Sequence, residues 1–173
     1  YAVARVSQEM LSLLYAKSYN QDIVMTRSFN HIGPGQSDVF VVSSFVRRIL
    51  EAKMSGMKEL QLPVGNIDII RDFLDVRGVV SAYNKLLHKG KKGEIYNVCS
   101  GCAVRLSEII MFISEALDIR VIPSVDDALV RPNDNMLIVG DNSKLCNDTD
   151  WHPHYCLKNS ISDIIEYWKI KLN

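Results

Sequence analysis

The chain has 173 residues, 47% of them hydrophobic, and its 20 Lys and Arg residues balance its 20 Asp and Glu residues. This length suits one hydrophobic core, and the even charge excludes a strong field that would attract nucleic acid or an anionic membrane. The apolar runs are shorter than a membrane span, the first residues lack a secretory signal, and the four cysteines are too few for a disulfide scaffold. We therefore expect a soluble, cytoplasmic protein whose partner is a small molecule.

The beginning of the chain predicts a helix, a strand and a second helix. Apolar residues recur at three- and four-residue intervals over residues 1–18, which predicts a helix, and residues 23–26 form a short apolar run typical of a buried parallel strand. A Gly-Pro-Gly sequence predicts a loop over residues 30–38, and residues 39–53 predict the next helix. This order is typical of an α/β fold, in which ligands bind beyond the carboxyl ends of the strands.

The rest of the chain predicts shorter elements of the same two kinds. Strands are expected at residues 60–64, 69–74, 94–99 and 120–125, and helices at residues 76–88, 107–117, 141–146 and 157–171. The apolar residues of the first of these helices are expected to face the core, namely Val79, Val80, Tyr83, Leu86 and Leu87. The sequence contains no repeat and no obvious interdomain linker, so we expect a single unit.

Tyr1 and Arg5 have the spacing of two residues on the same face of a helix, one turn apart. A phenol with a pKa near 10 exchanges protons at neutral pH only where a nearby cation favours the phenolate. The pair therefore has the chemistry of a proton donor and its activating cation. An isolated Tyr-x-x-x-Arg is common by chance, so the interpretation depends on the motifs that follow it.

Those motifs run in order along nearly the whole chain. They are Arg27-x-Phe29-Asn30-His31-x-Gly33-Pro34-Gly35-Gln36, Leu62-Pro63-Val64-Gly65-Asn66, Arg71-Asp72-Phe73-x-Asp75-Val76, Tyr96-Asn97-Val98-Cys99-Ser100-Gly101, Arg131-Pro132 and Asp150-Trp151-x-Pro153. Together with the Tyr-x-x-x-Arg pair they resemble the extended short-chain dehydrogenase/reductase family, also called the NAD-dependent epimerase/dehydratase family. The Asn-His-Ile-Gly-Pro-Gly-Gln segment resembles its GDP-sugar branch, and the reductases of that branch more than the 4,6-dehydratases, which typically have an Arg-rich loop after Asn-His.

The resemblance implies an α/β chain that forms the C-terminal part of a Rossmann-like fold. Residues 1–60 would complete the Rossmann-like domain and include the catalytic helix. Residues 61–173 would form mainly the sugar-nucleotide subdomain, with some elements returning to the Rossmann-like part. The first βαβ units are absent, and with them the Gly-rich loop that holds the cofactor pyrophosphate at a helix N-terminus. We therefore expect NAD(P) to bind in the complete enzyme and not tightly to this chain alone.

The resemblance also implies the catalytic roles. Tyr1 would donate a proton to the C4 carbonyl oxygen of a keto sugar while a nicotinamide hydride reaches C4. Arg5 stands where the family has Lys, and would favour the Tyr1 phenolate. Asn30 and His31 would lie where the nicotinamide meets the sugar nucleotide and contact the cofactor, and Asn30 would contact the substrate as well.

Two arginines are implied to bind the GDP part of the substrate. Arg71 and Arg131 would contact its diphosphate or ribose, because a guanidinium fork pairs bidentately with anionic oxygens. The segment Val64-Gly65-Asn66 would lie along the nucleotide. Without the resemblance, Arg71-Asp72 would be interpreted as a surface ion pair of little consequence for stability.

The implied reaction is the NAD(P)-dependent reduction of the 4-keto group of a GDP-4-keto-6-deoxy-hexose. One alternative is 4,6-dehydration of GDP-mannose or a related reaction of another nucleotide sugar. Another is a non-catalytic module that binds a nucleotide sugar or mediates dimerisation, since the first helix belongs in the family to a dimer-forming bundle. The expected partners are a GDP-sugar, the missing Rossmann half and, in the complete enzyme, a second copy.

The cysteines and histidines raise metal binding as an alternative. Cys99-x-x-Cys102 has a ligand-like spacing, and Cys146, His152, His154 and Cys156 follow within eleven residues. The spacing of the later four matches no standard zinc finger, and Cys99 ends a predicted strand. We therefore expect free thiols and no metal site.

Overall fold

The computed structural model describes residues 2–130 and 134–173. Its helices are α1 (Ala2–Ser18), α2 (Val41–Met54), α3 (Val76–Lys89), α4 (Leu106–Leu117), α5 (Ser143–Thr149) and α6 (Leu157–Leu172). Its strands are β1 (Met25–Ser28), β2 (Asn30–Ile32), β3 (Glu59–Val64), β4 (Ile70–Arg71), β5 (Phe73–Asp75), β6 (Ile95–Val98), β7 (Val104–Arg105), β8 (Arg120–Val125) and β9 (Leu137–Ile138). A 3₁₀ turn, η1 (Asp127–Leu129), follows β8.

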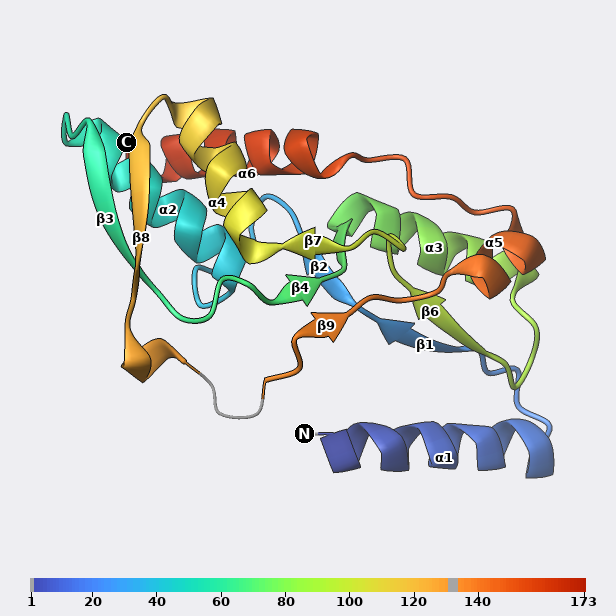
Figure 1. Cartoon of the computed structure of the whole chain (residues 1–173). Helices are drawn as coiled ribbons and strands as arrows, with labels where there is room; N and C mark the ends of the chain where they lie inside the picture. The colour runs from blue at the N-terminus through green and yellow to red at the C-terminus, as the bar shows by residue number, and fades with distance from the viewer. Residues whose placement is uncertain (1, 131–133) are drawn as a thin grey trace.

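The strands form short, mostly parallel pairs (Figure 1). β1 pairs with β6, β2 with β5 and β3 with β8, all in parallel, whereas β4 lies between antiparallel β7 and parallel β9. The register places Asn30 opposite Phe73 and Arg27 opposite Asn97. Three motifs that are far apart in the sequence therefore meet around β1, β2, β5 and β6.

The predicted division of the chain near residue 60 is crossed by strand pairing. β1 and β2 belong to the first predicted part, and their partners β6 and β5 belong to the second. β5 and β6, from the second predicted part, thus pair with strands of the first, as was expected for some elements of that part. The functional division itself stays a prediction.

The larger core lies where α2, α4 and α6 pack together over β3 and β8 (Figure 1). α2 buries Val42, Val46 and Ile49, which are spaced by four and three residues and so lie on one helical face. Trp168 of α6 is buried against the same helix, and its Nε1 donates a hydrogen bond to Ser43 Oγ at 2.9 Å. α6 is therefore joined to α2 by apolar packing and by a buried hydrogen bond.

A second, smaller core joins α3 and α5 to β5 and β6. Its buried members are Leu74, Val79, Ala82, Leu86, Tyr96, Val98, Leu145 and Trp151. Asp75 begins α3 as its N-cap, accepting from the Arg77 backbone N–H, and it also accepts from Ser160 Oγ of α6 at 2.5 Å. The cap residue thus joins the second core to the C-terminal helix.

Most predicted elements are confirmed, with differences where the pairing partner is distant in sequence. The predicted loop at residues 30–38 begins with β2, because β5 provides a parallel partner more than forty residues later. The predicted strand at 69–74 is divided into β4 and β5, and the predicted strand at 23–26 lies at 25–28. The helix predicted at 141–146 lies at 143–149 instead. β7, β9 and η1 were not predicted.

The buried face of α3 was predicted wrongly in part. Val79 and Leu86 are buried as expected, but Val80, Tyr83 and Leu87 are exposed, Leu87 by 85%. The face in contact with the sheet includes the small residues Gly78 and Ala82. Small side chains let the helix approach closely, and hydrophobicity alone does not indicate that contact.

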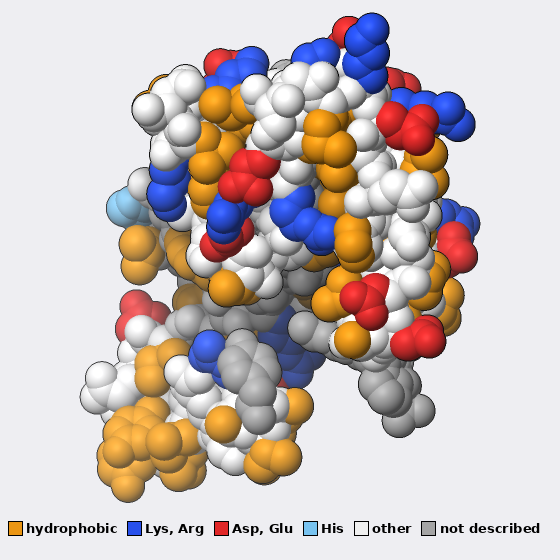
Figure 2. Space-filling model, turned by 90° about the vertical axis from the view of Figure 1, so that its left-hand side faces the viewer, with side chains coloured by type: hydrophobic (Ala, Val, Ile, Leu, Met, Phe, Trp, Pro, Cys, Tyr) orange, Lys and Arg blue, Asp and Glu red, His pale blue; other side chains and the backbone are white. Residues whose placement is uncertain are grey.

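α1 is the least packed helix. Of its side chains only Ala16 is buried, and apolar residues including Val3, Val6, Met10 and Leu14 are exposed. Glu9 joins it to β1 by accepting two hydrogen bonds from Arg27, at 2.7 and 2.8 Å. Figure 2 shows α1 as a lobe beside the main body, with hydrophobic side chains on its surface. Among the described residues, no helix combines the length and the apolar character needed to cross a membrane.

Candidate functional site

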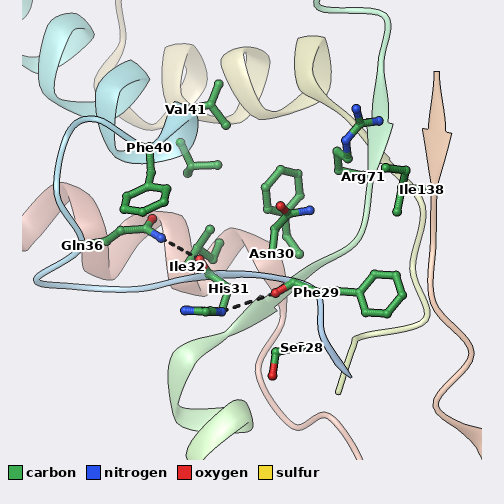
Figure 3. A pocket seen from close by; sticks show the side chains of 12 residues that line it. Ser28, Phe29, Asn30, His31, Ile32, Gln36, Phe40, Val41, Arg71 and Ile138 are labelled. Carbon is green, nitrogen blue, oxygen red and sulfur yellow. Dashed lines mark hydrogen bonds between the residues drawn. The ribbon is translucent and has the colours of Figure 1, made fainter. Parts of the chain in front are cut away.

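A cavity of about 620 Å³ opens where β1, β2, β4, β5 and β9 meet the start of α2 (Figure 3). It is lined by Ser28, Phe29, Asn30, His31, Ile32, Gln36, Phe40, Val41, Val42, Arg71, Phe73 and Ile138. Three of the predicted site residues, Asn30, His31 and Arg71, are therefore brought together. The lining mixes aromatic and aliphatic surface with a few polar groups, as is typical of small-molecule sites.

Asn30 is fixed by the main chain of the neighbouring segment. Its Nδ2 donates a hydrogen bond to the Asp72 carbonyl at 3.1 Å, and the parallel pairing of β2 with β5 sets its position. Because the amide nitrogen is used in this way, the remaining Oδ1 of Asn30 is suited to accept a hydrogen bond from a ligand.

His31 and Gln36 form the other polar side of the cavity. His31 is exposed, with Nδ1 3.4 Å from the Phe29 carbonyl oxygen, and Gln36 Nε2 donates to the His31 carbonyl at 2.8 Å (Figure 3). Ser43 Oγ of α2 donates to the Gln36 carbonyl at 2.8 Å. Gln36 Oε1 is buried and has no hydrogen-bond partner among the described residues. These bonds fix the loop between β2 and α2 along the cavity.

Arg71 ends β4 with its side chain only 12% exposed. Its Nη1 donates to the carbonyls of Ile70 and Asn135, at 2.9 and 2.6 Å. Its Nη2 donates to Asp134 Oδ1 at 2.6 Å. The guanidinium is thus held at the edge of the cavity by the segment that leads into β9.

Asp72, the next residue, points into the protein. It is fully buried, and its Oδ1 accepts from the backbone N–H and the hydroxyl of Ser100, at 2.8 and 2.7 Å. Its Oδ2 accepts from the backbone N–H groups of Gly101 and Gly140, at 2.9 and 3.3 Å. One carboxylate therefore holds the loop after β6 and the segment after β9 against the strand that carries Arg71.

Position 140, whose backbone N–H donates to Asp72, has room only for glycine. A Cβ at this position would lie 2.5 Å from Cys99 Sγ and 2.8 Å from a ring carbon of Phe29. Real Cβ atoms do not approach so closely, so the backbone can reach Asp72 here only because the residue is glycine.

The predicted segment 64–66 lies outside the cavity lining. Val64 is buried in the larger core, with its carbonyl accepting from the Asp126 N–H at 2.8 Å. A Cβ at Gly65 would lie 2.5 Å from the Leu129 carbonyl oxygen, so η1 covers this residue. Asn66 accepts a hydrogen bond from the Asp68 N–H at 2.9 Å. The predicted nucleotide contacts of this segment stay predictions.

Three other predicted residues are not part of the described cavity. Tyr1 and Arg131 lie outside the residues that the structure describes. Arg5 is exposed on α1, and its Nη1 donates to Gln8 Oε1 at 3.0 Å. The predicted pairing of Tyr1 with Arg5 therefore stays a prediction.

Several groups at the site were missed or left without a role by sequence reasoning. Gln36 belongs to the Asn-His-Ile-Gly-Pro-Gly-Gln motif, which implies no role for it, and the contact of Asp134 with Arg71 spans 63 positions. No short-range pattern indicates such a contact. Asp72 belongs to the Arg-Asp-Phe motif, and a carboxylate that follows a strand arginine is a usable signal for its role.

None of the four cysteines is among the residues that line the cavity. Cys99 is buried, and burial together with the charge of Asp72 raises the pKa of its thiol to about 12. All four cysteines are free thiols. Within residues 2–130 and 134–173, no group of three or more His, Cys, Asp and Glu side chains is placed to hold a metal ion.

The parallel strand pairs β1–β6, β2–β5 and β3–β8 and the helices around them define a Rossmann-like α/β protein, whose cavity is lined by polar groups and an arginine. The comparison with family models gives the family. The chain belongs to the family described as GDP-mannose 4,6 dehydratase, whose model matches residues 1–164.

Known relatives agree with this assignment. GDP-6-deoxy-D-mannose reductase of Pseudomonas aeruginosa is 36% identical over 172 residues, covering 99% of this chain and 56% of that protein. The solved structure of RMD from Pseudomonas aeruginosa complexed with NADPH has a TM-score of 0.91 at 35% identity, over 99% of this chain and 56% of that one. The solved structure of a UDP-glucose 4-epimerase from Thermotoga maritima with UDP-glucose has a TM-score of 0.89 at 22% identity, and the match covers 100% of this chain and 54% of that one. At this identity the match shows the shared fold alone. The predicted family and fold class are confirmed, and the chain spans about half the length of these relatives.

Proposed function

We propose that this chain binds a GDP-sugar at the cavity beside Arg71, as the substrate side of an NAD(P)-dependent enzyme that reduces the 4-keto group of a GDP-4-keto-6-deoxy-hexose. The observation that carries the proposal is the position of Arg71, a largely buried guanidinium at the edge of a cavity of about 620 Å³. The 36% identity with a GDP-6-deoxy-D-mannose reductase supports the choice of substrate.

Each polar group at the cavity has chemistry that suits this ligand. Arg71 suits a diphosphate, because its planar fork donates to two anionic oxygens at once. Asn30 Oδ1 suits a sugar hydroxyl or the nicotinamide amide, and His31 is exposed beside it. Arg131 and the segment 64–66 are proposed to hold the remainder of the nucleotide.

The catalytic part of the proposal rests on the sequence motif. When bound, NAD(P)H supplies the hydride that reduces C4 of the sugar. The Tyr1 hydroxyl then gives its proton to the C4 oxygen, which completes the alcohol, and Arg5 stabilises the phenolate left behind. An Arg5→Lys variant of the complete enzyme is expected to keep or raise turnover, because Lys is the family residue.

We propose that tight binding of the cofactor requires residues beyond the 173 of this chain. Asn30 and His31 offer contacts for the nicotinamide end only, and the printed sequence contains no Gly-x-x-Gly-x-x-Gly loop for the pyrophosphate. Because the chain spans 56% of its reductase relative, we propose that the remainder of the complete protein supplies that loop. The free thiols fit a reducing compartment, and we propose the cytoplasm.

Homodimerisation is proposed for the complete enzyme through α1. The helix exposes Val3, Val6, Met10 and Leu14, and exposed apolar surface of this kind marks an association site.

A second candidate reaction, 4,6-dehydration of GDP-mannose, is favoured by the family model that matches residues 1–164. The two reactions differ in product, because dehydration releases water from the sugar and the reduction adds two hydrogens.

Calorimetric titration of the 173-residue chain with GDP and with NADPH tests the proposal. We expect weak GDP binding and negligible NADPH binding. Arg71→Gln is expected to weaken GDP binding by about tenfold, because a charge-assisted bidentate contact is lost. Arg105→Gln is the matched control, since it removes the same charge from the neighbouring strand β7 outside the cavity lining. Tight NADPH binding, or equal GDP binding by the Arg71 variant, would contradict the proposal.

A further inference from the structure

A chain of hydrogen bonds leads from the C-terminal helix to the loop along the cavity. Trp168 of α6 is 4% exposed, and its Nε1 donates to Ser43 Oγ of α2 at 2.9 Å. Ser43 is fully buried, and its Oγ donates to the Gln36 carbonyl at 2.8 Å. Gln36 Nε2 in turn donates to the His31 carbonyl at 2.8 Å. Three hydrogen bonds therefore connect α6, through α2, to the polar side of the cavity.

The chemistry of the three groups fixes the direction of the first two bonds. An indole N–H can only donate a hydrogen bond, and a main-chain carbonyl can only accept one. Ser43 Oγ therefore accepts from Trp168, which leaves its own proton for the Gln36 carbonyl. Because Ser43 is buried, rotation of its hydroxyl would leave that carbonyl without this partner, which is costly away from water. Trp168 thus favours the hydroxyl orientation that holds the loop.

Trp168 also contacts a second group that holds the loop. Arg47 of α2 forms ion pairs with Asp38 of the loop and with Glu51, the latter at 2.8 Å. The Arg47 guanidinium lies 5.8 Å from the centroid of the Trp168 ring, within the range of a cation–π contact. The side chains of Arg47 and Asp38 are 40% and 34% exposed, and ion pairs of this exposure stabilise little. The buried bond from Ser43 is therefore the stronger of the two holds.

The loop between β2 and α2 (residues 33–40) presents Gln36 and Phe40 to the cavity. Gln36 Oε1 is buried and has no hydrogen-bond partner within residues 2–130 and 134–173, whereas Nε2 of the same amide is used by His31. A buried acceptor at a cavity wall is satisfied when a ligand donates to it, and a sugar hydroxyl is such a donor. The position of this acceptor depends on the Gln36 main chain, which Ser43 holds.

We propose that Ser43 and Trp168 are positioning residues for the sugar side of this site. They hold the Gln36 main chain so that its side-chain acceptor meets the hexose of the GDP-sugar. Neither residue is among those that line the cavity, so both act without touching the ligand, and Trp168 acts on Ser43 from 125 positions along the chain. This inference rests on the proposed function and deepens it.

Hydrogen–deuterium exchange of the 173-residue chain tests the position of the loop without any ligand. The N–H groups of Gln36 and Phe40 are hydrogen-bonded within the loop, to the carbonyls two positions into the loop's turns, so their exchange reports its order. We expect the amides of residues 33–40 to exchange about fivefold faster in Ser43→Ala, the factor for one net hydrogen bond. Trp168→Phe keeps an aromatic ring and the Ser43 hydroxyl, so its effect on the same amides should be smaller, about twofold.

Ser114→Ala is the matched control. The Ser114 hydroxyl also donates to a main-chain carbonyl, that of Ile119 at 2.6 Å, outside the cavity lining. This variant should leave exchange over residues 33–40 unchanged. Circular dichroism verifies the fold of each protein. Unchanged exchange of the loop in Ser43→Ala overturns the inference, and so does an equal acceleration over the loop and over β3, which would indicate a general loss of stability.

The double variant distinguishes a chain of bonds from two separate effects. In a Ser43→Ala background, Trp168→Phe should cause no further change over residues 33–40, because Trp168 acts through the hydroxyl that is already removed. If the two substitutions instead accelerate exchange of the loop additively, Trp168 acts independently of Ser43 and the inference is wrong.

Calorimetric titration with GDP and with GDP-mannose tests the consequence for the site. The second ligand carries a hexose on its terminal phosphate, so the ratio of the two Kd values reports what the sugar contributes. We expect Ser43→Ala to bind GDP-mannose about fivefold more weakly than the parent does, while GDP affinity, which Arg71 is proposed to set, changes less than about twofold. An unchanged ratio overturns the inference while GDP binding leaves the proposed function standing. If the parent binds neither ligand, the proposed function fails and the role toward the hexose fails with it.

Discussion

Asp72 is the carboxylate on which the loops around the cavity depend, so its replacement by Ala should be costly. The side chain is fully buried and accepts from the backbone N–H groups of Ser100, Gly101 and Gly140, and from the Ser100 hydroxyl. In Asp72→Ala the hydroxyl can rotate to another partner. The three backbone donors cannot, because each belongs to a chain segment already fixed in place.

The expected cost follows from these three donors. Leaving a buried donor without its acceptor costs about 1–3 kcal/mol, so three of them lower the free energy of unfolding by roughly 3–9 kcal/mol. That is a large part of the roughly 5–15 kcal/mol that stabilises a typical domain. Asp72→Asn should lose less, since its amide oxygen still accepts on one side while its NH₂ group faces the donors on the other.

Urea unfolding followed by tryptophan fluorescence measures these free energies. Asp68→Ala is the matched control, because its side chain is 70% exposed and it lies two residues before the start of β4. The control should change stability by less than about 0.5 kcal/mol. A loss below about 1 kcal/mol in Asp72→Ala would refute the reasoning, since it would mean that water or a local shift replaces the carboxylate.

Three further predictions concern buried groups elsewhere. Trp168→Phe should lower the free energy of unfolding by about 1 kcal/mol more than Trp151→Phe does. The reason is that Trp168 Nε1 donates to a buried serine, whereas Trp151 Nε1 has no partner in the described part of the chain. Urea unfolding of both variants measures the difference, and an equal or smaller loss in Trp168→Phe would mean that the hydrogen bond is unimportant. Burial raises the pKa of Asp75, but hydrogen bonds from Arg77 and a serine hydroxyl outweigh it and leave the pKa below its usual value. Its stabilisation is therefore complete above about pH 4 and lost as the pH falls through the folded-state pKa, so Asp75→Asn should lose less stability than the parent on acidification, and an equal loss would contradict this. Cys99, with its raised pKa of about 12, should be the last thiol alkylated by iodoacetamide in the folded chain, and mass spectrometry that finds it labelled as fast as the exposed thiols would argue against its burial.

Local periodicity predicted the helices well because their stability comes from one apolar face. α2 was expected at 39–53 and lies at 41–54, and its buried residues have the expected three- and four-residue spacing. α3 is confirmed in extent, but its buried face is not the one with most apolar residues. Tyr83 is exposed, and its hydroxyl forms a hydrogen bond with Ser28 Oγ at 2.8 Å. Which face a helix buries depends on what packs against it, and the sequence of the helix does not contain that information.

The short strands were harder to predict because their partners are distant. β4, β7 and β9 have two residues each, too few for an alternating pattern to be recognised. They form because β4 lies between the other two, and the chain brings β9 there from more than sixty positions away. The contact between Asp134 and Arg71 follows from this pairing, so it was invisible to any local pattern.

The dipeptide Arg71-Asp72 explains why the site was predicted only in part. Taken by itself it suggested a surface ion pair, yet the two charges do not pair with each other. Successive side chains of an extended segment point to opposite sides, so Arg71 reaches the cavity edge and Asp134, while Asp72 reaches inward to the backbone of Ser100, Gly101 and Gly140. Each charge is therefore held by groups from another part of the chain. The inward carboxylate fixes the strand and the loops beside it, and the outward guanidinium needs a fixed strand to present its fork to a ligand. Substitution of Asp72 should consequently weaken GDP binding even in molecules that remain folded, through the position of Arg71 and not through its charge.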